Sequence, residues 1–202
     1  MHLFRRFRSP SARTRRSRTT RPLQFESLEE RTVLSSDGLL DPTFGAAGFV
    51  SHDLGGIEWG QSIAVQTDGR IVVAGFQDPT RLAVARYEAN GAVDTSFGVN
   101  GAFVITLATS AFSTSMALDS QGRILVAGMS TNAGKDDFTL LRLTPQGTLD
   151  TTFAVGGIAR TNINGGFSSP QSLVIQQDGK ILVTGLDRKS TRLNSSHVAL
   201  SR

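Results

Sequence analysis

The sequence predicts an all-β fold of tandem four-stranded blades of the propeller type, preceded by a disordered basic N-terminus. Three observations predict it. A pair of glycine-rich blocks recurs three times, with lead glycines at Gly38, Gly91 and Gly147, which are 53 and 56 residues apart. Short apolar runs alternate with Gly- and Asp-rich turns, as in strands and hairpins. A small sheet repeated at this period is a propeller blade, whose faces are covered by neighbouring blades.

The recurring blocks define three units: repeat 1 at 38–90, repeat 2 at 91–146 and a truncated repeat 3 at 147–186. The first block reads GLLDPTFGAAG, GAVDTSFGVNG and GTLDTTFAVGG in turn, and the second reads DGRIVVAG, QGRILVAG and DGKILVTG. The positions that we predict to be structurally important recur within these units: Asp41, Phe44, Gly69, Gly75, Arg86, Asp94, Phe97, Gly122, Gly128, Arg142, Asp150, Phe153, Gly179 and Gly185.

Repeat 1 contains four candidate strands, at 49–54, 61–67, 70–75 and 81–88. Asp68-Gly69 fits a two-residue hairpin loop, because glycine readily adopts the positive φ that such turns need. Repeat 2 is three residues longer between its second and third strands, so we expect its STNAGKDD segment to form an inserted loop. The chief alternative architecture is a β-solenoid, whose units are usually shorter and whose parallel coils do not fit hairpin turns.

The recurring side chains favour a structural role. Phe44, Phe97 and Phe153 hold one position, which we interpret as packing between blades. The recurring aspartates and the arginines of the first two units suggest an Asp–Arg pair that joins one blade to the next, since a buried charge needs a partner. The functional alternative is a ring of aspartates that binds a cation or a sugar on one rim.

These motifs resemble the delta-60 repeat, and the match covers residues 38–186. Proteins of that family are large, exported bacterial proteins whose tandem units look like propeller blades. The resemblance implies a repeat scaffold and does not by itself imply a reaction.

The net charge of +4 averages over unlike segments. Residues 1–22 form an Arg-rich leader with eight arginines and no acidic residue, whereas residues 23–186 carry 9 basic and 16 acidic residues. Because the basic charge lies in the tails, the sequence does not favour nucleic-acid binding; a DNA-binding arm would show salt-sensitive affinity.

Residues 23–37 include LEERTVLS (28–35), which resembles the LEPR-XLL segment of large exported bacterial proteins, with Glu30 in place of Pro and Val33 in place of Leu. No apolar stretch of a conventional signal peptide precedes Gly38. The resemblance implies export to the cell surface or beyond.

The C-terminal residues 187–202 depart from the repeat. DRKSTRLNSSH (187–197) resembles a translated sequencing adapter, which suggests that this segment is an artefact and that the natural protein continues into further blades. Three units would not close a ring of 4–8 blades, so we expect residues 38–186 to be marginally stable or to self-associate.

Sites for chemistry are sparse. The chain has no cysteine, which excludes disulfides, thiolate metal ligands and a cysteine nucleophile. We interpret His52 as an ordinary strand residue. Asp136-Asp137 is interpreted as part of a solvated loop rather than a calcium site. Trp59 beside Glu58 is interpreted as a core residue rather than one that stacks on a sugar. We predict no catalytic residue, cofactor or metal site.

Two functions remain open at this point. The favoured one is a non-catalytic, exported scaffold for surface adhesion or for binding an extracellular carbohydrate or protein. The alternative is a propeller hydrolase or lyase acting on a carbohydrate or lactone, with its active-site residues in blades outside this sequence.

Overall fold

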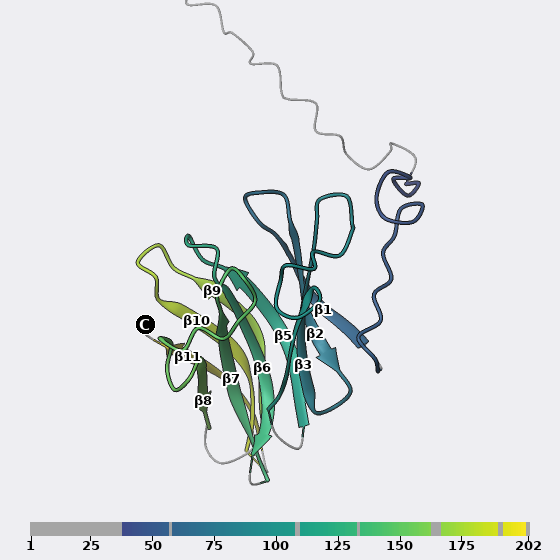
Figure 1. Ribbon diagram of the computed structural model, residues 1–202. Coiled ribbons are helices and arrows are strands. Elements are labelled where there is room, and N and C mark those ends of the chain that lie inside the picture. The colour runs from purple at the N-terminus through teal and green to yellow at the C-terminus, as the bar shows by residue number, and fades with distance from the viewer. Residues whose placement is uncertain are drawn as a thin grey trace, which may run out of the picture.

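The computed structural model contains three antiparallel sheets that follow one another along the chain (Figure 1). It describes residues 38–56, 58–107, 110–132, 134–162, 167–189 and 192–200. Blade 1 comprises β1 (Glu58–Val65), β2 (Ile71–Gln77), β3 (Arg81–Tyr87) and β4 (Ala102–Thr106); blade 2 comprises β5 (Ser110–Leu118), β6 (Ile124–Asn132), β7 (Lys135–Leu143) and β8 (Ile158–Thr161); blade 3 comprises β9 (Phe167–Ile175), β10 (Ile181–Lys189) and β11 (Arg192–Leu200). The predicted all-β class is confirmed. The predicted segments 1–22 and 23–37 lie outside the described residues.

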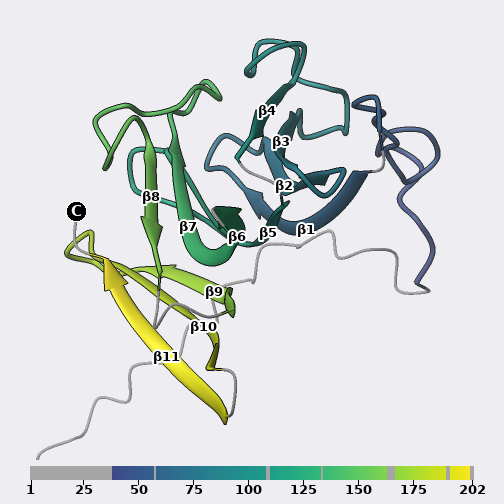
Figure 2. The ribbon, with the colours of Figure 1, turned by 90° about the horizontal axis from the view of Figure 1, so that it is seen from below.

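The blades stand side by side in an open arc, with β1, β5 and β9 as their inner strands (Figure 2). Each inner strand contacts the inner strand of the next blade. The outer strands β4 and β8 lie at the opposite edges of blades 1 and 2. This arrangement is that of consecutive propeller blades.

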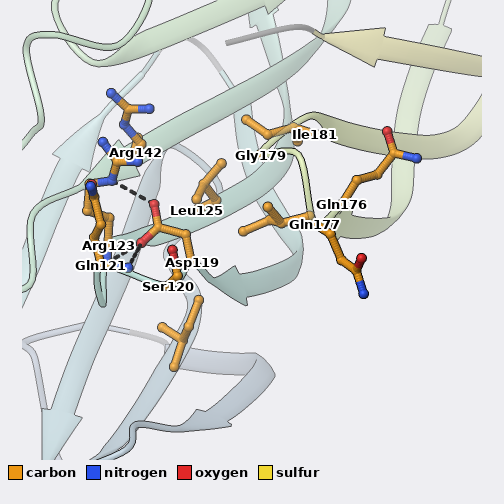
Figure 3. A pocket seen from close by; sticks show the side chains of 12 residues that line it. Asp119, Ser120, Gln121, Arg123, Leu125, Arg142, Gln176, Gln177, Gly179 and Ile181 are labelled. Atoms are coloured by element: carbon orange, nitrogen blue, oxygen red, sulfur yellow. Dashed lines mark hydrogen bonds and ion pairs between the residues drawn. The ribbon is translucent and has the colours of Figure 1, made fainter.

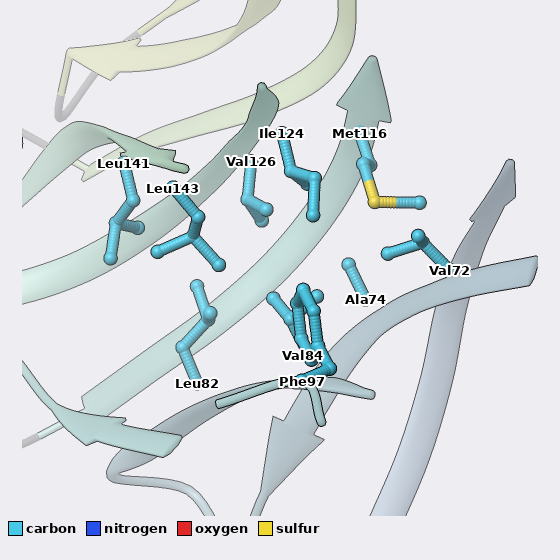
Figure 4. Packing of buried hydrophobic residues seen from close by; sticks show 10 residues of the cluster. All are labelled: Val72, Ala74, Leu82, Val84, Phe97, Met116, Ile124, Val126, Leu141 and Leu143. Carbon is cyan, nitrogen blue, oxygen red and sulfur yellow. The ribbon is translucent and has the colours of Figure 1, made fainter. Parts of the chain in front are cut away.

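Two apolar cores hold the arc together, one in each gap between blades. The first joins blades 1 and 2 and includes Val72, Val84 and Phe97 from blade 1 and Val126 and Leu143 from blade 2 (Figure 4). A second core lies between blades 2 and 3. Blade 2 is therefore covered on both faces, which explains why its central strand ILVA (124–127) is apolar throughout.

The first hairpin of each blade has a three-residue loop, not the two-residue loop expected at Asp68-Gly69. Gln66 N–H donates to Arg70 O at 2.8 Å, and Gly69 N–H donates to Gln66 O at 3.0 Å with a φ of 85° at Gly69. A turn followed by a residue in the left-handed region is the usual geometry of a three-residue hairpin loop. Gly122 and Gly179 occupy the same place, with φ values of 74° and 80°.

The sheets are offset from the sequence repeat. Residues 49–54, expected as the first strand of repeat 1, belong to none of the sheets in the described part of the chain. The fourth strand of blade 1 is β4, which follows the second copy of the first block. In blades 1 and 2, the outer strand pairs with the third strand of its own blade. The described residues contain no such third strand ahead of 49–54, which explains why this segment joins no sheet there.

The insertion in blade 2 also differs from expectation. It lengthens the β6–β7 hairpin instead of forming a loop, with Ser130, Thr131 and Asn132 paired to Asp137, Asp136 and Lys135.

In blade 3, the backbone of β11 pairs with β10 from Ile181↔Leu200 to Lys189↔Arg192. The adapter origin of residues 187–202 stays a prediction.

Candidate functional site

The first recurring block forms the same tight turn in each of its three copies. A backbone hydrogen bond from the phenylalanine N–H to the aspartate carbonyl oxygen closes it, at 3.1 Å for Phe44–Asp41 and 3.0 Å for both Phe97–Asp94 and Phe153–Asp150. Gly45 and Gly98 follow with φ values of 56° and 55°, and Ala154 takes φ 44° in the third copy. The turn thus requires a left-handed residue after the phenylalanine, which explains the recurring glycine.

A buried ion pair ties this turn to the third strand of its own blade. Arg86 Nε lies 2.7 Å from Asp94 Oδ2, and the two side chains are only 8% and 5% exposed. The arginine also donates to Pro145 O in blade 2 at 2.6 Å, and its Cζ lies 4.7 Å from the centre of the Phe97 ring. The Asp–Arg pair lies within one blade, and a backbone carbonyl provides its contact with the next.

The third copy repeats this arrangement. Arg142 Nε lies 2.8 Å from Asp150 Oδ2, with the guanidinium carbon 4.6 Å from the centre of the Phe153 ring. In the first copy Asp41 is exposed and accepts hydrogen bonds from Thr43 N and Oγ1 at 2.8 and 2.7 Å. Among the described residues, no arginine forms an ion pair with Asp41.

The surroundings of the buried aspartates favour their ionised forms. Burial raises the pKa of Asp94, but hydrogen bonds from Ser96 and Arg86 outweigh it and hold that pKa below its usual value. For Asp150 the hydrogen bond from the Thr152 hydroxyl is the largest influence, and it likewise lowers the pKa. Both carboxylates are therefore stable anions that are bound to partners within the blade.

A second pair of arginines extends the network and was missed by the sequence reasoning. Arg70 Nε lies 3.3 Å from Asp94 Oδ2, and Arg123 Nη1 lies 3.7 Å from Asp150 Oδ2. Both come from the hairpin turns of the second block, where the chain reads Asp/Gln-Gly-Arg. Their recurrence at one position was a signal that could have identified them.

The last glycine of the second block allows close approach of the neighbouring strand. Gly75, Gly128 and Gly185 stand opposite β-bulges in β1, β5 and β9. The bulged strand approaches closely, and a Cβ at Gly75 would collide with the carbonyl oxygen of Trp59. These glycines are needed for backbone packing rather than for ligand binding.

Beside the ion pairs, a cleft of about 320 Å³ with polar and apolar lining opens between blades 2 and 3 (Figure 3). The hairpin turns of the two blades face each other across it, with Ser120 and Gln121 on one side and Gln176 and Gln177 on the other. These four side chains are exposed. A similar cleft between blades 1 and 2 is lined by residues 65–68 and 118–122.

The charged groups in the cleft neutralise one another. Asp119 Oδ2 accepts from Arg123 Nε at 2.6 Å, and Asp119 Oδ1 accepts from Gln121 N at 2.9 Å. The polar groups left for a ligand are thus uncharged amides and hydroxyls, and they lie beside apolar side chains such as Leu118 and Ile175. Such groups donate and accept hydrogen bonds, which suits a polyhydroxylated ligand.

Aromatic residues of repeat 1 form ring contacts with one another in blade 1. Trp59 is 53% exposed and stacks on Phe76 with ring centres 5.8 Å apart, so the expectation of a core tryptophan was wrong. His52 Nδ1 lies 3.3 Å from the hydroxyl oxygen of Tyr87, and these two residues line a shallow cleft together with Trp59. The Phe76 ring in turn meets the Phe112 ring of β5 edge to face, with ring centres 5.0 Å apart.

The adjacent acids of the β6–β7 hairpin are used in its hydrogen bonds. Asp136 Oδ1 accepts from Thr131 Oγ1 at 2.5 Å, and Asp137 Oδ1 accepts from Asn162 Nδ2 at 2.7 Å. They lie in β7 and not in the expected loop. Within the described ranges, no group of three or more His, Cys, Asp or Glu side chains could hold a metal ion. The same residues contain no helix with the length and apolarity of a membrane span.

A protein-family model agrees with this architecture. Residues 66–97 and 120–153 match the family described as "Domain of unknown function (DUF5122) beta-propeller". No curated protein matches the chain. A crystal structure of a protein of unknown function from Bacteroides caccae is similar at 13% identity and a TM-score of 0.36, over 72% of this chain and 62% of that one. The chain thus spans less than two thirds of that structure. The family match over these residues and the sheet topology support a propeller-like repeat fold.

Proposed function

We propose that this protein is a non-catalytic β-propeller scaffold, exported by a bacterium, that binds an extracellular carbohydrate in the clefts between its blades. The observation that carries the proposal is that the recurring charged residues bind one another within the blades. Arg86 and Asp94, like Arg142 and Asp150, bind each other and hold a turn in place. The residues that differ between repeats, such as Gln121 and Gln177, line the clefts instead.

The uncharged character of the clefts supports a carbohydrate over a phosphate or a metal ion. Exposed glutamine amides can pair with sugar hydroxyls as donors and as acceptors. The Arg and Asp side chains nearby are bound to one another, so their charges are already compensated. The resemblance to exported repeat proteins supports an extracellular location for such a ligand.

A glycan array tests the binding half of the proposal. The purified chain should bind a defined subset of immobilised glycans, and the double substitution Gln176→Ala/Gln177→Ala should reduce that binding at least fivefold. Gln171→Ala is the matched control, since Gln171 is exposed on the same blade and does not line the cleft. Binding only to immobilised proteins, or equal loss in the control, would refute the carbohydrate proposal.

Export is tested separately with residues 1–40 fused to a reporter in a bacterial host. We expect the reporter outside the cytoplasm, and substitution of Leu28 and Glu29 by Ala to retain it inside. A fusion that stays cytoplasmic whether or not the segment is intact would contradict export and leave the carbohydrate proposal standing.

A further inference from the structure

Three aromatic rings form a row at one end of the first gap between blades. Trp59 of β1 lies in register with Phe76 of β2, and the planes of their rings differ by only 11°. Phe76 in turn meets Phe112 of β5 edge to face, with an angle of 83° between the two rings. The indole is thus held parallel to a phenylalanine that a second blade keeps in place.

One face of the Trp59 ring is open to a ligand. β1 is an edge strand of its sheet, so Trp59 has a neighbouring strand only on the side where Phe76 lies, and its side chain is 53% exposed. The same repeat position holds Phe112 in blade 2 and Ser169 in blade 3, each in register with the residue that follows the last glycine of the second block. The blade fold therefore does not require an indole at this position.

Hydrogen-bonding groups lie beside this ring. Trp59 lines a cleft of about 360 Å³ together with Glu58, His52 and Tyr87. Glu58 Oε1 accepts from Leu54 N at 3.1 Å, which fixes the carboxylate at the wall of the cleft. His52 Nδ1 and the Tyr87 hydroxyl oxygen are 3.3 Å apart and hold each other in place. The cleft thus combines an aromatic platform with donor and acceptor groups, as binding sites for small polar molecules do.

We propose that Trp59 stacks on a pyranose ring of an oligosaccharide whose hydroxyl groups bond to Glu58, His52 and Tyr87. The face of an indole carries partial negative charge, and it attracts the C–H groups that form the flat face of a sugar with equatorial hydroxyls. A quaternary ammonium ion is another ligand that such a face attracts. Glu58 is the only carboxylate among the residues that line this cleft, and one carboxylate beside imidazole and hydroxyl groups suits a polyhydroxylated ligand better than a cation.

This site lies apart from the clefts of the proposed function. β1 runs from Glu58 to Val65, and Val65 lines the cleft between blades 1 and 2. At about 3.3 Å per residue, the strand from Trp59 to Val65 separates the two sites by about 20 Å. The inference shares its ligand class with the proposed function, yet it rests on none of the residues that line those clefts. Either can therefore fail alone.

Fluorescence tests the stacking directly, because Trp59 is the only tryptophan in the 202-residue chain. Cellohexaose, xylohexaose and chitohexaose are titrated into the full protein. We expect at least one of them to shift the Trp59 emission to shorter wavelength and to reduce its quenching by acrylamide at least about twofold. Gln176→Ala/Gln177→Ala should leave this response unchanged. No response to any of the three sugars, or the same response to tetramethylammonium, would overturn the inference. Glycan binding that depends on Gln176 and Gln177 while Trp59 stays unresponsive would overturn it and leave the proposed function standing.

Affinities measured by calorimetry with the responding sugar give a second test. Trp59→Leu keeps an apolar side chain beside Phe76 but removes the ring face, and it should weaken binding at least about tenfold. Trp59→Tyr retains a ring and should keep most of the affinity. Phe49→Leu is the matched control, since Phe49 is 56% exposed and lies outside the cleft lining. Circular dichroism checks that each variant is folded. Equal losses in Trp59→Leu and Trp59→Tyr, or a loss in the control as large as in Trp59→Leu, would contradict stacking.

Discussion

Arg86 Nε lies 2.7 Å from Asp94 Oδ2, and both side chains are buried beside the ring of Phe97. The two residues are eight positions apart, one in β3 and the other in the turn that leads to β4. The pair thus fixes the connection between the third and fourth strands of blade 1. The same separation joins Arg142 to Asp150, so blades 1 and 2 each contain one such ion pair.

Removing the Asp94 carboxylate should destabilise the folded protein. Asp94→Asn leaves the Arg86 charge buried without a counter-ion, and we expect the free energy of unfolding to fall by about 3–5 kcal/mol. Asp68→Asn is the control, because the Asp68–Arg70 pair is 48% and 37% exposed and should contribute at most about 1 kcal/mol. Urea unfolding followed by circular dichroism measures both. Equal effects of the two substitutions would mean that burial of the Arg86 pair contributes nothing.

The lowered pKa values of Asp94 and Asp150 predict an acid-sensitive fold. In the unfolded chain these groups titrate near their usual value of 3.8, and in the folded protein they titrate below it. Their stabilisation is therefore complete above the usual value and is lost as the pH falls through the lowered one. Melting temperatures at pH 7, 5, 4 and 3 should show the wild type converging on Asp94→Asn/Asp150→Asn at low pH. A gap that stays constant down to pH 3 would show that these carboxylates keep their charge there or act through another contact.

Gly147 tests the packing between the motif turns of successive blades. Its φ is 82°, and a Cβ there would lie 2.8 Å from the ring of Phe97 and 2.8 Å from Gly98 N. Gly147→Ala should therefore combine backbone strain with a clash. Gly134→Ala isolates the strain alone, because Gly134 has φ 75° and nothing within 4 Å of the added Cβ. We expect Gly147→Ala to cost about 1–3 kcal/mol more than the control. Similar losses would argue that Phe97 can move aside.

Ala154 offers a stabilising change at the same turn. It adopts φ 44°, a conformation that disfavours alanine and that Gly45 and Gly98 supply in the other copies. Because glycine loses more entropy on folding, part of the gain is offset. Ala154→Gly should raise the free energy of unfolding by up to about 1 kcal/mol. A thermal melt of the variant beside the wild type measures it, and a loss of stability would indicate that the Ala154 methyl group makes a needed contact.

Local chemistry made much of this fold predictable. Alternation at Ile63 and Val65 and the continuous apolar run at 71–74 located strands, and the recurring glycines located the turns that need a positive φ. The recurrence of Asp94 and Arg86 predicted their pairing. These features are readable because strand patterning and left-handed turns depend on residues that are close in sequence.

Strand partners and exposure were decided by the tertiary structure. Residues 49–54 and 102–106 have equivalent places in the repeat, yet only the second group joins a blade, because it has β3 before it as a hydrogen-bonding partner. The structure likewise placed the Asp–Arg pair within a blade and left Trp59 exposed.

The sequence by itself determined the all-β class, the number of motif copies and the residues that form their turns. The tertiary structure decided where each blade begins, which residues line the clefts and which apolar face is left uncovered. Periodicity fixes the spacing of repeated elements but not the point at which a sheet starts. That point depends on which strand is available to pair, and hydrogen bonds between strands form across distances in the chain that local patterns do not record.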